Sequence, residues 1–519
     1  MASGPGIATN GLGPRGTRLG RAALVALTLL LGGAGPAVAQ AVDAFGPVVG
    51  GELGPGFGRL VDPDRTRRTA GESGFRLTPS LTNTLEYSDN VDLEPDDTDS
   101  AFITRVTPGL AFTARSARFD SAFRGSLSFR HQTAGDDDGL NVDTDAVGFA
   151  DAELVREHLF LENEVSVSQQ VLDNDQANTE SNRETVQTYR VSPVFRTRLG
   201  READLEARYV FDAVLTGDEA QASDQIGHRA QLGVGSSRTD DPLQWSADAA
   251  VAKQRRRDST DVDRSDFGLS NEYALNRTLS VLAIGGYQTF DDGQNVDFQS
   301  PTYRGGFRLR GRRTDFAFLY GKIDDRFSPE VRLTYKFSER LRAVASYTER
   351  VSTSQERLVD TLADLGRDAD DGAFVDDRTG ARFDPRSDPF DIDDQTVRIK
   401  AGRLDVFGSR GRNSYLVRGY LGREENLDEG GDEEIARLDV GFSRQLNRRT
   451  TLGLSGGYER IDFDTNRTDN EYLFDARLGY DLGRRVNLFA SYLFRTQDSD
   501  VSSAEYTENR LGIGLRLTF

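Results

Sequence analysis

Apolar and polar residues alternate along most of the chain, beginning near residue 75. The first clear segment places Phe75, Leu77, Leu81, Leu85 and Tyr87 on one face and polar residues between them. A period of two is that of a β-strand with one apolar and one polar face. The same alternation recurs many times, for example in residues 119–130, 205–212, 327–337 and 472–481. The pattern therefore predicts a long series of similar strands.

Two kinds of connection alternate between these strands. Tight connections include residues 116–117, 200–201 and 483–485. The longer connections are rich in Asp, Asn, Gln and Ser, and they contain stretches such as 173–175 and 424–434. Short periplasmic turns that alternate with longer outside loops are typical of outer-membrane barrels with an even number of strands. We expect an all-β, antiparallel, up-and-down transmembrane barrel over residues 75–519, with about 22 strands (18–22).

Composition fits a barrel and excludes several other classes. The mean hydropathy is −0.54, and no stretch after the first forty residues is long enough for a membrane helix. Barrel strands need apolar residues only at alternate positions, so a low hydropathy does not argue against them. The absence of cysteine excludes disulfides, thiolate metal sites and a cysteine nucleophile.

The N-terminal residues have the layout of a secretory signal peptide. Three arginines precede the apolar run 22–31, and Ala37-Val38-Ala39 supplies small residues for cleavage after Ala39. A short membrane anchor is the alternative, although the apolar run is short for that role. Residues 40–74 are rich in Gly and Pro and predict a flexible periplasmic leader. This leader is too short to be the plug domain of a TonB-dependent receptor.

The last ten residues, Arg510–Phe519, alternate strictly and end on an aromatic side chain. They resemble the terminal strand of bacterial outer-membrane barrels, in which an aromatic last residue is the signal for assembly. This resemblance implies that Phe519 is the assembly signal and that the protein resides in the cell outer membrane.

The segment 351–394 is far longer than any other connection, and ten aspartates lie between residues 368 and 394. We expect it to be the largest extracellular loop. A loop of this length either folds into the lumen and narrows it or stands outside as a cap, and its acidity alone does not choose. Residues 354–365 within it are compatible with a short helix.

Many polar positions on the inward face are arginines. Rows of charge in a pore set its selectivity, so they are candidates for lining a path for an anionic polymer or small anions. The alternative is that they pair with Glu206, Glu330, Asp439 and Asp475 on neighbouring strands and stiffen the wall. The lumen-lining candidates are Arg124, Arg190, Arg196, Arg198, Arg304, Arg308, Arg332, Arg398, Arg477 and Arg516.

Other chemistry finds little support in the sequence. The net charge of −20 disfavours nucleic acid as a partner. Acidic loops could bind divalent cations that bridge to lipopolysaccharide phosphates, but residues 368–372 miss the EF-hand spacing. Residues 453–457 match G-x-S-x-G, although they lie within a predicted strand rather than at a strand-to-helix turn. The three histidines are widely dispersed, so we predict no catalytic, cofactor or metal site.

The opening of the predicted barrel carries a family resemblance. Tyr87-Ser88-Asp89-Asn90-Val91 and Val106-Thr107-Pro108-Gly109 resemble the first two strands of the Putative beta-barrel porin 2 family. Members of that family occur beside exopolysaccharide synthesis and exosortase genes, which implies a role in polymer export or surface assembly. The resemblance assigns no functional residue.

The sequence thus predicts a monomeric porin-like conduit for exopolysaccharide or another polar solute. The partners expected are outer-membrane lipid, lipopolysaccharide, the barrel assembly machinery and polysaccharide. A structural or adhesive barrel whose acidic loops bind lipopolysaccharide or matrix polymer is the second hypothesis, and an outer-membrane hydrolase is the third.

Overall fold

The computed structural model describes residues 74–519 except 97, 136–138, 178, 180–181, 218–222, 238–240, 258, 364, 368–373, 377–382, 384–389, 429 and 466. The predicted signal peptide and nearly all of the predicted leader lie outside the described residues.

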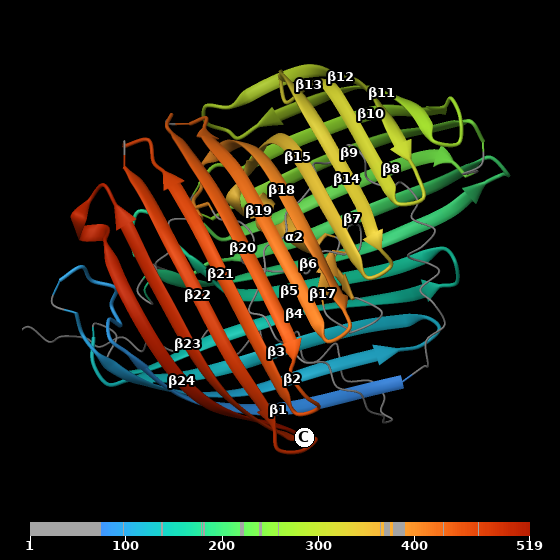
Figure 1. The fold of residues 1–519 in the computed structure, drawn as a ribbon. Coiled ribbons are helices and arrows are strands. Elements are labelled where there is room, and N and C mark those ends of the chain that lie inside the picture. Colours follow the sequence, from blue (N-terminus) through green and yellow to red (C-terminus); the bar gives the residue numbers. More distant parts are fainter. Residues whose placement is uncertain are drawn as a thin grey trace, which may run out of the picture.

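Twenty-two long strands form one sheet (Figure 1). Their bounds are β1 Gly74–Ser88, β2 Ala101–Arg115, β3 Phe119–Gln132, β4 Gly139–Val155, β5 Leu159–Val171, β6 Arg183–Leu199, β7 Ala203–Leu215, β8 Gln225–Ser236, β9 Leu243–Arg256, β10 Val262–Ala274, β11 Leu279–Asp291, β12 Asp297–Arg310, β13 Thr314–Ile323, β14 Arg326–Ser338, β15 Leu341–Thr353, β18 Thr396–Arg410, β19 Asn413–Asn426, β20 Asp432–Gln445, β21 Thr450–Asp462, β22 Thr468–Asp481, β23 Val486–Ser499 and β24 Tyr506–Thr518.

Each strand of this sheet pairs antiparallel with its neighbour in the chain, and β15 pairs with β18. The remaining elements are helix α2 (Ser354–Leu362), the short hairpin β16 (Leu365–Arg367) and β17 (Phe374–Asp376), and the 3₁₀ turn η1 (Ser502–Ala504). The predicted fold class and strand number are confirmed.

The sheet closes where the first strand meets the last. Strand β24 pairs with β1 from Thr518 opposite Ser80 to Arg510 opposite Ser88, which is nine residue pairs. The β1–β2 ladder has fifteen. Hydrogen bonds extend the closure at both ends, from the backbone N–H of Phe519 to Pro79 O at 3.0 Å and from that of Asp89 to Asn509 O at 3.2 Å. A closed ladder leaves no free sheet edge.

Connections differ between the two ends of the barrel. One end, here the turn end, has short connections such as residues 200–202 and 411–412 and lies next to the C-terminus. The other, the loop end, has the longer ones, including residues 172–182 and 354–395. One loop-end connection departs from the expected pattern, because Asp324 and Asp325 alone join β13 to β14 in a tight turn with positive φ.

The outward face of the wall is apolar, as the alternation predicts. On β24, Leu511 and Ile513 are 59% and 63% exposed, whereas Glu508, of the opposite parity, is fully buried. Outer-membrane barrels carry aromatic side chains at both membrane interfaces. Aromatic side chains exposed here include Tyr87, Trp245, Tyr273, Tyr287, Tyr303, Phe337 and Tyr480. Within the part of the chain that the structure describes, no helix has the length and apolar character needed to cross a membrane.

Candidate functional site

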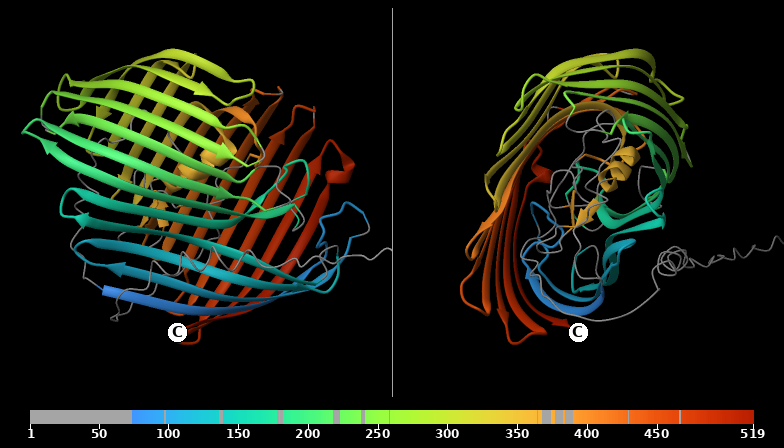
Figure 2. Two further views of the ribbon diagram at one scale, coloured as in Figure 1. Left: turned by 180° about the vertical axis from the view of Figure 1, so that it is seen from behind. Right: turned by 90° about the vertical axis from the view of Figure 1, so that its right-hand side faces the viewer.

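The described part of the long acidic segment folds into the barrel rather than standing outside it. Helix α2 lies within the ring of strands in the end-on view of Figure 2. It begins at Ser354, and the hydroxyl of the preceding Thr353 caps it by accepting a hydrogen bond from the Glu356 backbone N–H at 3.2 Å. Eight of its nine residues are buried, although five of them are polar or charged. Buried polar groups require partners, and the barrel wall supplies them.

Arginines from three strands hold the acidic side of the helix. Arg229 of β8 lies 3.1 Å from Glu356 and 3.7 Å from Asp360. Arg350 of β15 reaches Asp360 at 3.0 Å, and Arg264 of β10 lies 3.9 Å from Glu356. Glu356 and Asp360 are one helical turn apart and therefore share a face. Strands distant in the sequence are thus joined through one helix.

The tight turn at Asp324 forms a second centre of polar contacts. Its carboxylate accepts a hydrogen bond from the Val351 backbone N–H at 2.9 Å and lies 3.4 Å from Arg264, and Gln288 also donates to it. Arg398 donates to the Asp324 carbonyl oxygen at 3.4 Å. The β13–β14 turn therefore links the inner faces of β10 and β11 to those of β15 and β18 at the loop end.

The remaining surface of the segment is apolar and packs against other parts of the wall. Leu358 and Val359 pack with Val186 of β6 and Val214 of β7. Leu362 and Leu365 lie with Ala122, Val147 and Phe149 of β3 and β4, and Phe390 lies with residues of β18–β20. Arg367 reaches Asp120 of β3 at 3.5 Å. Residues 354–395, called the plug segment from here on, therefore contact several sides of the lumen.

The end of the plug segment is tied to the loops. The Asn174 N–H donates to the Asp391 carboxylate at 2.8 Å, and the Ser223 N–H donates to Asp394 at 2.9 Å. Within the segment, Gln355 of α2 donates to Asp394 at 2.7 Å. The β5–β6 and β7–β8 loops therefore hold the plug segment in place at the loop end.

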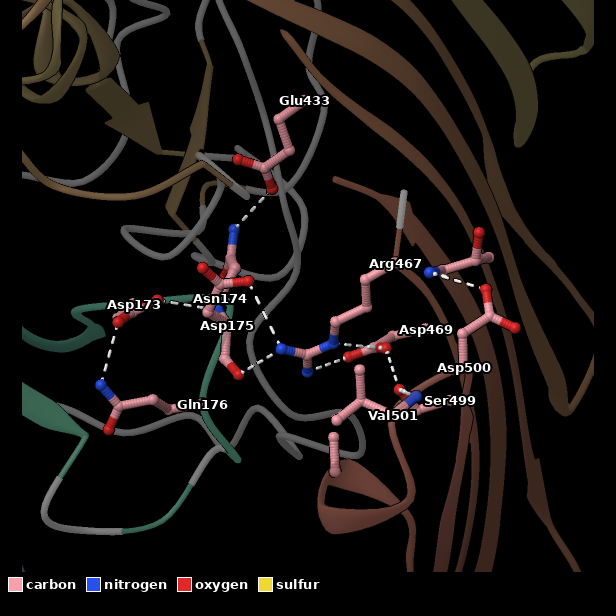
Figure 3. A network of polar contacts seen from close by, with 12 residues as sticks. Asp173, Asn174, Asp175, Gln176, Glu433, Arg467, Asp469, Ser499, Asp500 and Val501 are labelled. Carbon is pink, nitrogen blue, oxygen red and sulfur yellow. Dashed lines mark hydrogen bonds and ion pairs between the residues drawn. The ribbon is translucent and has the colours of Figure 1, made fainter. Parts of the chain in front are cut away.

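A wider network surrounds Asn174 (Figure 3). Its side chain donates to Glu433 at 3.0 Å, and Arg467 forms a bidentate contact with Asp469 and reaches Asp175 at 3.4 Å. Burial, together with the nearby Asp173, Asp393 and Asp175, raises the pKa of Asp391 to about 7. Burial also raises the pKa of Asp175. The carboxylates around Asn174 therefore outnumber the neighbouring cationic side chains, of which Arg467 is one.

One sector of the wall makes no polar contact with the described part of the plug segment. In the part of the chain that the structure describes, the hydrogen bonds and ion pairs of this segment reach none of β1, β2, β22, β23 and β24. These strands have their own network, in which Glu508 binds Ser88 at 2.6 Å, Arg510 at 2.6 Å and Arg495 at 3.1 Å.

Most of the predicted lumen arginines pair with carboxylates on the wall. Seven do so: Arg190 with Glu164, Arg196 with Glu206, Arg198 with Asp204, Arg304 and Arg332 with Glu330, Arg308 with Asp315, and Arg398 with Glu425. Arg124 lies over the Phe374 ring and Arg477 over the Phe489 ring. The predicted partners Glu206 and Glu330 are used, whereas no candidate arginine has an ion pair to Asp439 or Asp475 among the described residues.

Sequence reasoning missed the arginines that matter most for the plug segment, namely Arg229, Arg264 and Arg350. The signal available was the pair Glu356 and Asp360, whose spacing marks one acidic helix face and so calls for inward cations. The G-x-S-x-G stretch lies inside β21, not at a strand-to-helix turn.

Comparisons with known proteins agree with the architecture. The model of the family described as Putative beta-barrel porin 2 matches residues 435–519, which is the region of the last five strands. This match confirms the family resemblance for that region. No curated protein matches the chain.

Several solved structures resemble the barrel at low identity. The siderophore receptor PirA from Acinetobacter baumannii is 7% identical, with 86% of this chain and 81% of that chain covered and a TM-score of 0.45. The FrpB iron transporter from Neisseria meningitidis is 10% identical, with 88% and 84% covered and a TM-score of 0.47. A loop-deletion mutant of OmpT, an outer membrane protein of Vibrio cholerae, is 10% identical, with 86% and 99% covered and a TM-score of 0.32.

Proposed function

We propose that the protein is a porin-like outer-membrane conduit for a polar solute, most directly an exported exopolysaccharide, and that the plug segment controls its lumen. The observation that carries this proposal is the polar attachment of α2 inside the barrel. A segment that served only to fill space would be expected to present mainly apolar side chains. Instead, Glu356 and Asp360 are held by Arg229, Arg264 and Arg350.

Polar attachment suits a segment that moves. Separating charged partners in a water-filled lumen exchanges protein contacts for hydration, so an ion pair of this kind adds little net stability over the solvated state. The apolar face of α2 is small, because Leu358, Val359 and Leu362 are its main members. Both ends of the plug segment join strands at the loop end, which lets it swing away while the barrel stays closed.

The second hypothesis is an adhesive or structural surface barrel. The ties of Asp391 and Asp394 to the loops favour it, since they stabilise a filled lumen. The two hypotheses predict opposite results when the plug segment is removed. In a conduit, the lumen opens. In an adhesive barrel, removal weakens binding of the protein to lipopolysaccharide or matrix polymer.

The test replaces residues 354–394 with a short Gly/Ser linker and measures single-channel conductance in planar bilayers. The matched control replaces residues 500–505, a loop at the same end of the barrel that makes no hydrogen bond with the described part of the plug segment. We expect a large rise in conductance only in the plug variant, with a shift of ion preference toward anions as its carboxylates leave. A second measurement compares polymer export in cells with and without the protein.

The conduit hypothesis would be refuted by two results together. Neither the plug variant nor the parent would conduct ions, and cells that lack the protein would export polymer normally. Weakened binding of the plug variant to lipopolysaccharide or polysaccharide would then support the adhesive barrel.

A further inference from the structure

Two of the predicted lumen arginines stand apart from the others. Among the described residues, no carboxylate lies within 4.0 Å of Arg477 on β22 or Arg516 on β24, whereas seven of the other candidates have such a partner. Both belong to the sector that the plug segment leaves without polar contacts. Both face inward, because Leu478 on β22 and Ile513 on β24, of the opposite parity, are exposed on the outer face.

A phenylalanine on the strand between them holds one arginine in place. Phe489 of β23 is buried and aligns with Gly479 of β22 on one side and Gly514 of β24 on the other. The Phe489 ring occupies the space that a side chain at position 514 would need, since a Cβ there would lie 2.2 Å from it. The Arg477 guanidinium carbon lies 3.8 Å from the ring centroid. A cation–π contact therefore fixes the guanidinium without neutralising it.

The charges around Arg477 are of both signs. Asp475 and Glu86 attract Arg477 from beyond ion-pair distance, and Arg516 repels it. A wall that needed only stiffness would pair these arginines with carboxylates on the neighbouring strands, as it pairs seven of the other candidates. Two inward guanidinium groups without an ion pair among the described residues, one of them held on an aromatic ring, are suited to binding an anionic group.

We propose that Arg477 and Arg516 form a binding site for an acidic, carboxylate-bearing sugar chain at the turn end of the lumen. A guanidinium presents a planar fork of N–H donors that matches a carboxylate. The two arginines are four residue levels apart along the strands, about 13 Å, and two strands apart across the sheet, about 10 Å, so their backbones are about 16 Å apart. A chain of acidic sugars spans that distance and engages both side chains.

This inference rests on the proposed conduit and specifies its solute. The turn end corresponds to the periplasmic side in barrels of this type, so the site would receive the polymer as it enters. The acidic loop end then lies at the exit, where like charge disfavours rebinding.

The test measures equilibrium binding of an oligogalacturonate to the full barrel in detergent micelles by titration calorimetry. The double variant Arg477→Gln/Arg516→Gln is compared with the parent and with Arg308→Gln, which removes a lumen charge that is ion-paired to Asp315 at 2.6 Å. We expect the double variant to bind at least tenfold more weakly and Arg308→Gln to bind as the parent does. A neutral malto-oligosaccharide of the same length should bind to none of them.

Equal affinity of the double variant and the parent would overturn the site, and so would equal binding of the malto-oligosaccharide or of acetate. Heat-modifiable gel mobility verifies that each barrel is folded. If the double variant fails to fold, Arg477→Lys keeps the charge but loses the planar fork, and it should still weaken binding severalfold. Because binding in micelles needs no conductance, failure here is distinguishable from failure of the conduit.

Discussion

Glu356→Ala should release α2 from the barrel wall while leaving the barrel intact. In the structure this carboxylate lies 3.1 Å from Arg229 and 3.9 Å from Arg264, and it accepts a hydrogen bond from the Ser352 hydroxyl at 3.2 Å. The alanine variant removes all three contacts and leaves two inward arginines with fewer partners. The helix itself should tolerate the change, because alanine favours helix formation.

The size of the effect follows from the burial of these groups. Removing one partner of a fully buried ion pair costs about 3–5 kcal/mol, because the other charge is left without compensation. Arg229 retains 20% of its side-chain exposure, so lumen water can solvate it, and Asp360 remains as a second partner. We therefore expect the lower limit, about 3 kcal/mol, which is about a 100-fold change in the docking equilibrium.

Hydrogen–deuterium exchange of the α2 amides measures that equilibrium directly. Local opening exposes these amides, so their protection should fall about 100-fold in Glu356→Ala, while the protection of strand amides stays unchanged. Glu339→Ala at an exposed turn serves as the control, since it removes a carboxylate that has no ion pair among the described residues. Unchanged α2 protection in Glu356→Ala would refute the view that these contacts hold the plug segment.

Three further predictions concern assembly, register and pH. Deletion of Phe519 should lower the amount of folded barrel in the outer membrane, as read by heat-modifiable gel mobility, and an unchanged yield would contradict its role as assembly signal. Leu333→Arg should destabilise the barrel by about 2–4 kcal/mol near the midplane, whereas inward Thr334→Arg should be tolerated; the reverse order in urea titrations would mean the faces are exchanged. The pKa of Asp391, raised to about 7, means that the docked plug segment binds a proton more tightly than the released one. Docking should therefore weaken as the pH rises from about 4 to 7, and channel open probability should increase over that range and level off above it. Asp391→Asn should flatten the dependence, and an equally steep one in that variant would assign it to another group.

The strands were predictable because each one carries its own evidence. The alternation of Leu511 and Ile513 with Arg510 can be seen within a few residues of sequence. Because each strand of a closed barrel has the same environment, the same alternation recurs from strand to strand. A short helix was also expected within residues 354–365, and α2 occupies Ser354–Leu362 of that stretch. The short strands β16 and β17 were not, because three residues give too few positions to show a period.

The position of the plug segment was not predictable from the same reasoning. Its acidity alone did not choose between lumen and cap, and two of the arginines that hold it, Arg229 and Arg264, lie 127 and 92 positions before Glu356 in the sequence. Arg229 and Arg264 reach Glu356 only through the register and curvature of the closed sheet. Likewise, Arg477 and Arg516 differ from the other candidate arginines only in what surrounds them, which no local pattern records.

The closure between β1 and β24 also dictates the order in which the molecule can be built. Ser88 and Glu508 hydrogen-bond across 420 positions of the chain, whereas every other ladder except β15–β18 joins strands that follow one another within a short connection. Pairings between such distant residues form slowly. Hairpins can therefore accumulate early, but the first strand must keep an unpaired edge until the last residues have been delivered. Such an edge is a template for aggregation, and a chain that stopped short would give an open, sticky sheet rather than a smaller barrel.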